Sequence, residues 1–261
     1  MLHRNARRDE TPLLGATEVR GILGNVVRTL GCRVVSGQWS EKLPREADLI
    51  EELGVSRSVV REALRTLTAK GLIRSRPMEG TKVQPRSEWR LLDPDLISWT
   101  IEAGDKRALL TDLMKVRLVM EPGVVYAATE LATDEQRAAV TAAWNEKLRV
   151  ESDRGIPDLQ RRRNFITADL AFHQAFINVV GSEILDQLIR VVQAALRLLL
   201  DLQMQAKGST VKLIGMDEST RLHADVYDTF MRGNPEEAEQ AMRRLIQAAI
   251  EDAHQGFKLI G

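Results

Sequence analysis

The sequence predicts a mainly α-helical protein with two domains, and three observations support this prediction. Aromatic residues make up only 4% of the 261 residues, while leucine, alanine, arginine and glutamate are abundant, a composition that favours helices over sheets. Apolar residues recur with a helical period from about residue 94 to the end of the chain. Before that point, short helical patterns are followed by two strand-like runs.

The composition indicates a globular protein of the cytoplasm without a membrane partner. Hydrophobic residues make up 44% and charged residues 28% of the chain, which is enough apolar material for a core. No stretch of about 18 apolar residues occurs, so no membrane span is predicted. The N-terminus is polar and rich in arginine rather than apolar like a signal peptide. The single cysteine, Cys32, cannot form an internal disulfide, which suits a reducing compartment.

The net charge of zero hides an asymmetry between the two ends of the chain. Residues 1–90 contain 17 lysines and arginines against 11 acidic residues, a net charge of +6, so the remainder carries −6. A basic first third suggests that this part meets a polyanion such as nucleic acid. The alternative is an ordinary solvated surface.

Glycine and proline residues separate the predicted elements of the N-terminal part of the chain. Residues 1–16 lack periodicity and are expected to form a flexible arm. Helices are predicted over 17–36, 45–53 and 56–70, with glycines after each, and strands over 72–76 and 80–83. Pro85 and Pro94 flank a polar stretch, so we expect a domain over 17–85, a linker over 86–95 and a second domain over 96–258. Helices are predicted from there on over 94–103, 106–131, 134–152, 157–180, 182–206, 217–232 and 235–258.

Two short helices joined by a turn and followed by a hairpin are typical of a winged helix-turn-helix, which binds double-stranded DNA. The helix that begins after Ser56 would expose Arg57, Ser58 and Arg61. Arg57 and Arg61 are four residues apart and share a face, and arginine can donate two hydrogen bonds to guanine. Basic side chains around this helix suit backbone phosphates; they are Arg45, Lys70, Arg74, Arg76 and Lys82. The alternative is a small helical domain with solvated arginines.

Residues 43–83 resemble the DNA-binding domain of the GntR superfamily of transcription regulators. The resemblance lies in LPREADL (43–49), GVSRSVVREAL (54–64), GLI (71–73) and GTKV (80–83). It implies that Arg57 and Arg61 contact an operator and that the wing glycine, Gly80, enters the minor groove. The chain departs from the family pattern at Ala47, where many members have arginine, and at Met78, where many have glycine.

A second group of candidate functional residues lies in the segment 164–176. At 100° per residue, Asp169 and His173 fall within the same quarter of the helix as three phenylalanines. An acid on a core-facing stripe is costly unless it is paired, protonated or bound to a cation. Asp169 and His173 therefore form half of a metal or polar-ligand site. The alternative is a buried Asp–His pair that serves only the core.

Two further helices offer partners for this pair. His223 lies on a separate predicted helix and supplies a third candidate ligand. Arg117 lies on an otherwise apolar helix flank and suits the carboxylate of an effector by bidentate hydrogen bonding, with Arg197 as an additional candidate. The alternative for Arg117 is an ion pair with Glu121, four residues on and on the same face.

Residues 90–255 resemble the FCD ligand domain of the FadR subfamily within the GntR superfamily. The matching segments are 116–122, 169–173 and the His223 helix, followed by GNPEEA (233–238). The resemblance implies a bundle of six or seven helices, a homodimer and a small organic acid effector, often bound over a divalent metal such as zinc or manganese. Asp169, His173 and His223 match three of the family's four ligands, an Asp and three His. Leu245 stands at the fourth, so the site either holds a metal with three ligands or binds the effector directly.

The segment after the wing indicates the kind of effector. Trp89 and the run LDPDLISW (92–99) resemble the galactonate-operon repressors of this subfamily, which implies a sugar acid such as an aldonate. The sequence therefore predicts a ligand-responsive repressor of a sugar-acid or other organic-acid operon, released from DNA by its effector, and not an enzyme. A metal-responsive regulator is the alternative. A metal-dependent enzyme with a DNA-binding domain fits less well, because we can name no general base.

Overall fold

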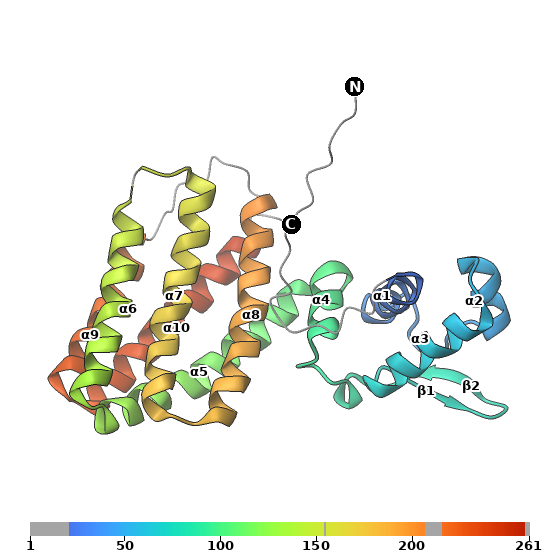
Figure 1. Ribbon diagram of the computed structural model, residues 1–261, viewed down its shortest axis with the longest axis horizontal. Helices are drawn as coiled ribbons and strands as arrows, with labels where there is room; N and C mark the ends of the chain where they lie inside the picture. Colours follow the sequence, from blue (N-terminus) through green and yellow to red (C-terminus); the bar gives the residue numbers. More distant parts are fainter. Residues whose placement is uncertain (1–20, 154, 207–215, 259–261) are drawn as a thin grey trace. The chain divides into compact units, whose positions relative to one another are not determined.

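The computed structural model describes residues 21–153, 155–206 and 216–258 (Figure 1). The chain separates into two compact units, residues 1–105 and 106–261, and each is described by itself. The predicted flexible arm, residues 1–16, lies outside the described residues, as does the start of the predicted helix 17–36.

The first unit is a winged helix-turn-helix followed by one more helix. Its elements are α1 (Ile22–Val35), α2 (Glu46–Leu53), α3 (Arg57–Ala69), β1 (Ile73–Arg76), β2 (Gly80–Val83), the 3₁₀ turn η1 (Arg86–Glu88) and α4 (Pro94–Ala103). The strands pair antiparallel, with Ile73 opposite Val83 and Arg76 opposite Gly80. The predicted helix-turn-helix and its small wing are thus confirmed.

One apolar core holds the first unit together. Leu30 of α1, Leu49 of α2 and Leu67 of α3 are completely buried in it. The turn between α2 and α3 depends on Gly54, whose φ of 62° lies in the left-handed region, where a side chain is disfavoured. This turn sets the angle at which α3 leaves α2 and therefore which face of α3 is exposed.

Helix α4 belongs to the first unit, which differs from the expected linker over 86–95 and domain start at 96. Leu96 and Trp99 are buried in the same core as α1, and a Cβ on Gly31 would lie 2.4 Å from the Trp99 ring. The sequence predicted this helix over 94–103, and proline is favourable at its first position. The physical reason for the difference is that its apolar side chains pack in the core of the first unit. Asp93 caps that helix by accepting hydrogen bonds from two of its first backbone amides. The division between the units therefore falls at residues 105 and 106.

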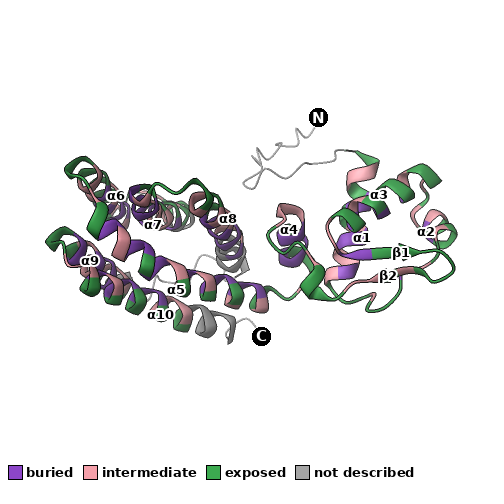
Figure 2. Ribbon diagram, turned by 90° about the horizontal axis from the view of Figure 1, so that it is seen from below, coloured by how far each residue is buried: buried purple, intermediate pink, exposed green. Residues whose placement is uncertain are grey.

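The second unit is a bundle of helices. They are α5 (Lys106–Leu131), α6 (Asp134–Ser152), α7 (Asp158–Val180), α8 (Glu183–Ala206), α9 (Met216–Arg232) and α10 (Pro235–Lys258), close to the predicted ranges. Helices α6, α7 and α8 form a layer, and α5 lies between this layer and α10. Their buried faces turn toward one another (Figure 2). No helix among the described residues is long and apolar enough to span a membrane.

Candidate DNA interface and buried metal centre

The recognition helix α3 buries one face and exposes the other. Val60, Leu64 and Leu67 pack into the core, and the opposite face carries Arg57 and Arg61, both exposed. Ser56 and Ser58, at the start of the helix, are exposed as well. The Ser56 hydroxyl accepts a hydrogen bond from the Val59 amide at 3.4 Å, so it caps the helix, and it lies 2.8 Å from the Ser58 hydroxyl.

Arg61 of α3 and Lys82 of the wing pair with carboxylates at the surface. Arg61 pairs with Glu46 at 3.0 Å, and Lys82 of the wing pairs with Glu79 at 2.6 Å. Arg45 is exposed at the start of α2. Exposed ion pairs of this kind contribute about 0–1 kcal/mol, so a phosphate can replace the carboxylate at little cost.

The tip of the wing has an unusual backbone. Gly80 has a φ of 83°, and Met78 has a φ of 65° although it is not glycine. The Met78 side chain is fully exposed in the turn. Position 78, at which family members often carry glycine, therefore has a backbone conformation that favours glycine.

Lys70 does not face solvent as the predicted phosphate contact would. Its Nζ lies 2.7 Å from the Asp93 carboxylate and 2.8 Å from that of Asp95, and its side chain is only 12% exposed. The ammonium also lies 5.7 Å from the Trp99 ring centre. The side chain therefore ties the end of α3 to the start of α4, and its contact with DNA stays a prediction.

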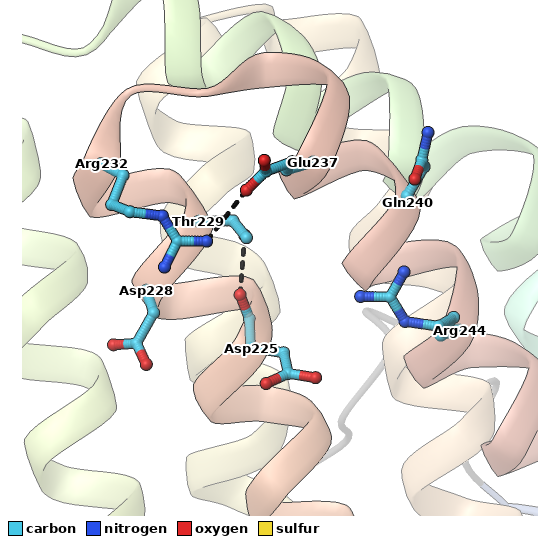
Figure 3. A pocket seen from close by; sticks show the side chains of 7 residues that line it. All are labelled: Asp225, Asp228, Thr229, Arg232, Glu237, Gln240 and Arg244. Carbon is cyan, nitrogen blue, oxygen red and sulfur yellow. Dashed lines mark hydrogen bonds and ion pairs between the residues drawn. The ribbon is translucent and has the colours of Figure 1, made fainter.

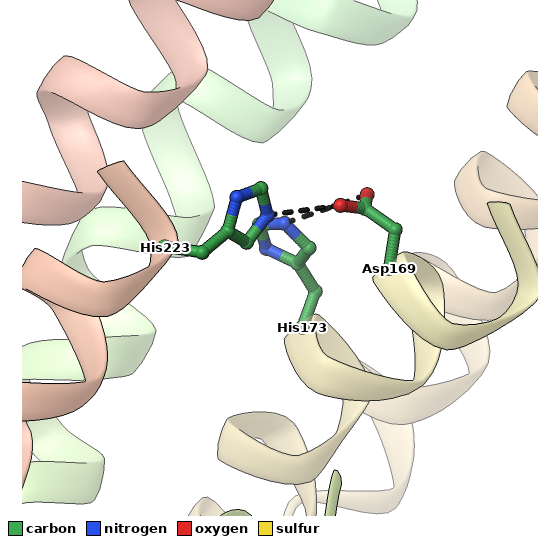
Figure 4. Close-up of side chains that lie close together, drawn as sticks. All are labelled: Asp169, His173 and His223. Atoms are coloured by element: carbon green, nitrogen blue, oxygen red, sulfur yellow. Dashed lines mark ion pairs between the residues drawn. The ribbon is translucent and has the colours of Figure 1, made fainter. Parts of the chain in front are cut away.

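The second unit brings Asp169, His173 and His223 together (Figure 4). Asp169 and His173 lie one turn apart on α7, and His223 reaches them from α9. The His223 Nε2 atom lies 2.9 Å from Asp169 Oδ1, and the His173 Nε2 atom lies 3.9 Å from Asp169 Oδ2. One ligand atom from each residue lies within 4.8 Å of the other two, so the group could hold a metal ion.

The second nitrogen of each histidine decides which atom is free to bind. His223 Nδ1 lies 2.7 Å from the Ser219 carbonyl oxygen, and His173 Nδ1 lies 2.7 Å from Glu121 Oε2. The Ser219 carbonyl oxygen can only accept, so His223 Nδ1 is the donor, and in the neutral ring of His223 the Nε2 atom carries a lone pair. Burial lowers the pKa of His223 despite the opposing charge of Asp169, which favours the neutral ring.

The three residues therefore fit a divalent metal. Two imidazole nitrogens and a carboxylate oxygen lie within 4.8 Å of one another, and His223 Nε2 has no hydrogen-bond partner although it is buried. Acceptors in such an arrangement repel one another unless a cation or proton lies between them. Histidine ligands held by a hydrogen bond from the other ring nitrogen are characteristic of metal centres.

Arg117 pairs with Glu121, which is the alternative that the sequence offered for it. Its guanidinium donates to both Glu121 oxygens, at 2.6 and 3.1 Å, and both side chains are buried. Burial alone would raise the pKa of Glu121, but the charge of Arg117 and the contact with His173 outweigh it and lower that pKa to about 2. Arg117 thus holds Glu121, which in turn contacts His173, and its contact with an effector stays a prediction.

Sequence reasoning missed Lys147 of α6. The side chain is completely buried, and its Nζ lies 3.2 Å from Asp169 Oδ1 and 2.9 Å from Glu151 Oε1. Burial would raise the pKa of Asp169, but His223 and Lys147 together hold it well below its ordinary value. A signal existed, because Lys147 follows Val140 and Trp144 on the apolar stripe of its helix.

The floor of the centre is aromatic. The Phe172 ring lies 5.5 Å from the His223 ring and 5.7 Å from the Trp144 ring, and Trp144 stacks on Tyr227. The histidine side chains are nearly inaccessible, whereas the Asp169 side chain is 21% exposed. A ligand would therefore approach the centre from the side of the Asp169 carboxylate.

Two other residues considered from the sequence do not join the cluster. Arg197 lies half-buried on α8, and within the described part of the chain no contact links it to the three ligands. Leu245 is buried on α10, so an apolar side chain stands where the resemblance implied the fourth ligand.

A separate cleft of about 260 Å³ lies between α9 and α10 (Figure 3). It is lined by three carboxylates and two arginines among its seven residues, and Arg232 is already paired with Glu237 at 2.9 Å. This excess of acid gives the cleft no preference for an anion. None of the predicted effector-binding residues lines it.

Two family models match the chain. The model of bacterial regulatory proteins of the gntR family matches residues 25–83, and the FCD domain model matches residues 112–248. The chain belongs to the GntR family and carries an FCD domain. It is thus a transcription regulator, as the sequence predicted, and not an enzyme.

Individual relatives support this assignment. The chain is 30% identical to the galactonate operon transcriptional repressor of Escherichia coli K12, over 86% of this chain and 93% of that protein. It is 30% identical to the repressor NanR of Enterobacter sp. strain 638, over 78% and 73%, and 28% identical to the regulator LutR of Bacillus subtilis, over 83% and 93%.

A solved structure shares the fold. It is the protein Lar, described as controlling the agr system of Listeria monocytogenes, with a TM-score of 0.54 and 17% identity. The match covers 92% of this chain and 99% of that one.

Proposed function

We propose that this regulator is a repressor of an operon for sugar-acid catabolism, active in the cytoplasm and released from its operator by the sugar acid. The observation that carries this proposal is the group of Asp169, His173 and His223, whose ligand atoms lie within 4.8 Å of one another. The repressors among its relatives, including the galactonate repressor, support the direction of regulation.

The DNA-binding part of the proposal rests on the exposed face of α3. Arg57 and Arg61 would read base edges, with Ser56 and Ser58 at the helix start beside the backbone. Arg45, Lys82 and Gly80 would contact phosphates and the minor groove. Two copies of the chain, related by a two-fold axis, would bind the two halves of a near-palindromic operator.

The sensing part of the proposal is a metal-assisted carboxylate site. Asp169, His173 and His223 would hold a zinc or manganese ion, with Glu121 and Ser219 fixing the two imidazole rings. The ion, when bound, supplies a Lewis-acidic position for a carboxylate oxygen of the effector. Arg197 remains a proposed additional contact from α8.

Effector binding and DNA binding then oppose each other. A ligand that weakens operator binding must itself bind less tightly to the DNA complex than to the free protein. If the effector is the substrate of the enzymes that the operon encodes, a repressor that the substrate releases from DNA allows expression when the substrate is present.

A thermal-shift screen tests the sensing part directly. The purified protein is heated with galactonate, other aldonates and simple carboxylates, each with and without zinc or manganese. A ligand at 100 times its Kd should add about 2.7 kcal/mol of stability. We expect one aldonate to stabilise the protein in the presence of metal, and this shift to vanish in Asp169→Asn.

A matched control and the contrary outcomes complete the design. Asp228→Asn changes a carboxylate of the α9–α10 cleft and should leave the shift intact. A shift with metal alone, unaffected by any acid, would make the protein a metal-responsive regulator. No shift with any acid would reject the sugar-acid effector while leaving the DNA-binding assignment in place.

A further inference from the structure

Lys147 places a fixed positive charge inside the proposed metal centre. Its ammonium lies 3.2 Å from Asp169 Oδ1, the same oxygen that faces His223 Nε2 at 2.9 Å. Phe165 lies beneath it, with the ring centre 4.0 Å from Nζ, and the side chain has no exposed surface. A lysine is thus built into the centre, where it contacts a proposed ligand directly.

Among the described residues, the charges that ion pairs link around the centre do not balance. Arg117 and Lys147 are positive, and Glu121, Glu151 and Asp169 are negative, which leaves a net charge of −1 with neutral histidines. A divalent cation changes this to +1. A monocarboxylate effector would then bring the metal-loaded centre to zero.

We propose that Lys147 makes metal binding and carboxylate binding depend on each other. The inference rests on the metal centre of the proposed function. An uncompensated charge in a buried site is costly, so the metal-loaded centre favours an anion because Lys147 is present. Without Lys147 the same metal would neutralise the centre on its own, and no anion would be needed.

A purely structural role for Lys147 predicts the opposite result. If the ammonium only held the Asp169 carboxylate in place, its removal would disorder a metal ligand and weaken metal binding. If its charge opposes the cation, its removal strengthens metal binding. The sign of the change in metal affinity therefore separates the two roles.

Four full-length proteins form a charge series for this test. Lys147→Met gives the centre a charge of −2, wild type −1, and Glu151→Gln zero. The double variant Lys147→Met/Glu151→Gln removes one charge of each sign and returns the centre to −1. Glutamine at position 151 keeps an oxygen for the hydroxyl of Thr220, which now donates to Glu151 at 2.6 Å.

The measurement is the Kd for Mn²⁺ by calorimetry, in acetate or in chloride of equal ionic strength. Acetate serves as the minimal carboxylate, so the identity of the natural effector is not needed. In chloride we expect Lys147→Met to bind Mn²⁺ at least tenfold more tightly than wild type, the double variant to match wild type, and Glu151→Gln to bind at least tenfold more weakly. Acetate should tighten binding severalfold in wild type and the double variant, and not in Lys147→Met.

The outcomes separate the inference from the function on which it rests. Equal affinities across the series, or weaker binding by a folded Lys147→Met, overturn the inference and leave the metal centre standing. If no protein binds Mn²⁺ or Zn²⁺ while a sugar acid still stabilises wild type, the metal centre and the inference both fail. If Lys147→Met does not fold, the Mn²⁺ affinities of Glu151→Gln and the double variant are compared instead. The inference then requires the double variant to bind Mn²⁺ more tightly than Glu151→Gln.

Discussion

The two units of the molecule each enclose a lysine between two carboxylates, and the two arrangements serve different ends. In the first unit, Lys70 pairs with Asp93 and Asp95 beneath the edge of Trp99. In the second, Lys147 pairs with Glu151 and Asp169 above Phe165. The parts are alike: an ammonium, two carboxylates and an aromatic ring.

The surroundings make the difference between the two lysines. Asp93 also accepts hydrogen bonds from the first amides of α4, so the donors around Lys70 match the acceptors. Asp169, by contrast, faces His173 and His223 in addition to Lys147, and His223 Nε2 has no hydrogen-bond partner. The first arrangement is complete and fixes a helix, whereas the second groups three residues that could hold a metal ion. Satisfied polar groups thus indicate structure, and unsatisfied ones indicate a binding site.

The largest effect expected is the loss of stability in Lys147→Met. Removing one partner of a buried ion pair costs about 3–5 kcal/mol, because it leaves the other charge buried without compensation. Urea unfolding in the presence of a chelator measures this loss. Adding Mn²⁺ should restore a large part of it, because the metal replaces the missing charge. A loss below about 1 kcal/mol in metal-free buffer would show that Asp169 and Glu151 do not need the ammonium.

The matching change in the first unit, Lys70→Met, should cost less and should not respond to metal. The Lys70 side chain is 12% exposed and those of its partners are 20 and 22% exposed, so water compensates part of the loss. We expect the first unit to lose about 1–3 kcal/mol, measured by urea unfolding. Recovery with Mn²⁺ would contradict the distinction between the two lysines.

The pH dependence of this contribution has a definite sign. Burial would lower the pKa of Lys70, but Asp93 and Asp95 outweigh it and raise that pKa. The stabilisation is therefore complete below the unfolded pKa of about 10.4 and is lost as the pH rises through the folded pKa above it. The difference in stability between wild type and Lys70→Met should stay constant from pH 7 to 9.

Lys70 and Lys147 show how much of the structure can be predicted from the sequence. Helical periodicity predicted nearly every helix of both units, and the 100° rule placed Asp169 and His173 on one face. Neither rule finds partners across the fold: Lys70 and Asp93 are 23 positions apart, and His223 could be offered as a third ligand only by its residue type and matched by a family resemblance. Lys147 lies on an apolar stripe as Asp169 does, so the reasoning that found the acid would also have found the lysine.

A smaller effect is expected on the DNA-binding face, where charges are exposed. Arg61→Ala should weaken specific operator binding by about 1–3 kcal/mol if the side chain reads a base, measured by fluorescence anisotropy at fixed salt. Arg65→Ala is the matched control, because Arg65 lies one turn further along α3 and pairs with Glu62. Equal effects of both changes, with the same loss on random DNA, would mean that neither arginine reads sequence.

The smallest expected effect is that of replacing Lys82, which tests whether DNA can displace the partner of an exposed ion pair. Lys82→Ala should weaken binding to all sequences alike and reduce the salt dependence of log Kd by about one phosphate contact. Glu79→Gln removes the present partner of Lys82, 2.6 Å away, and should strengthen binding slightly, since the ammonium no longer has to leave a carboxylate. Titrations at several salt concentrations measure both slopes. An unchanged slope in Lys82→Ala would place the wing away from the phosphates and leave Arg45 and α3 as the contacts to the backbone.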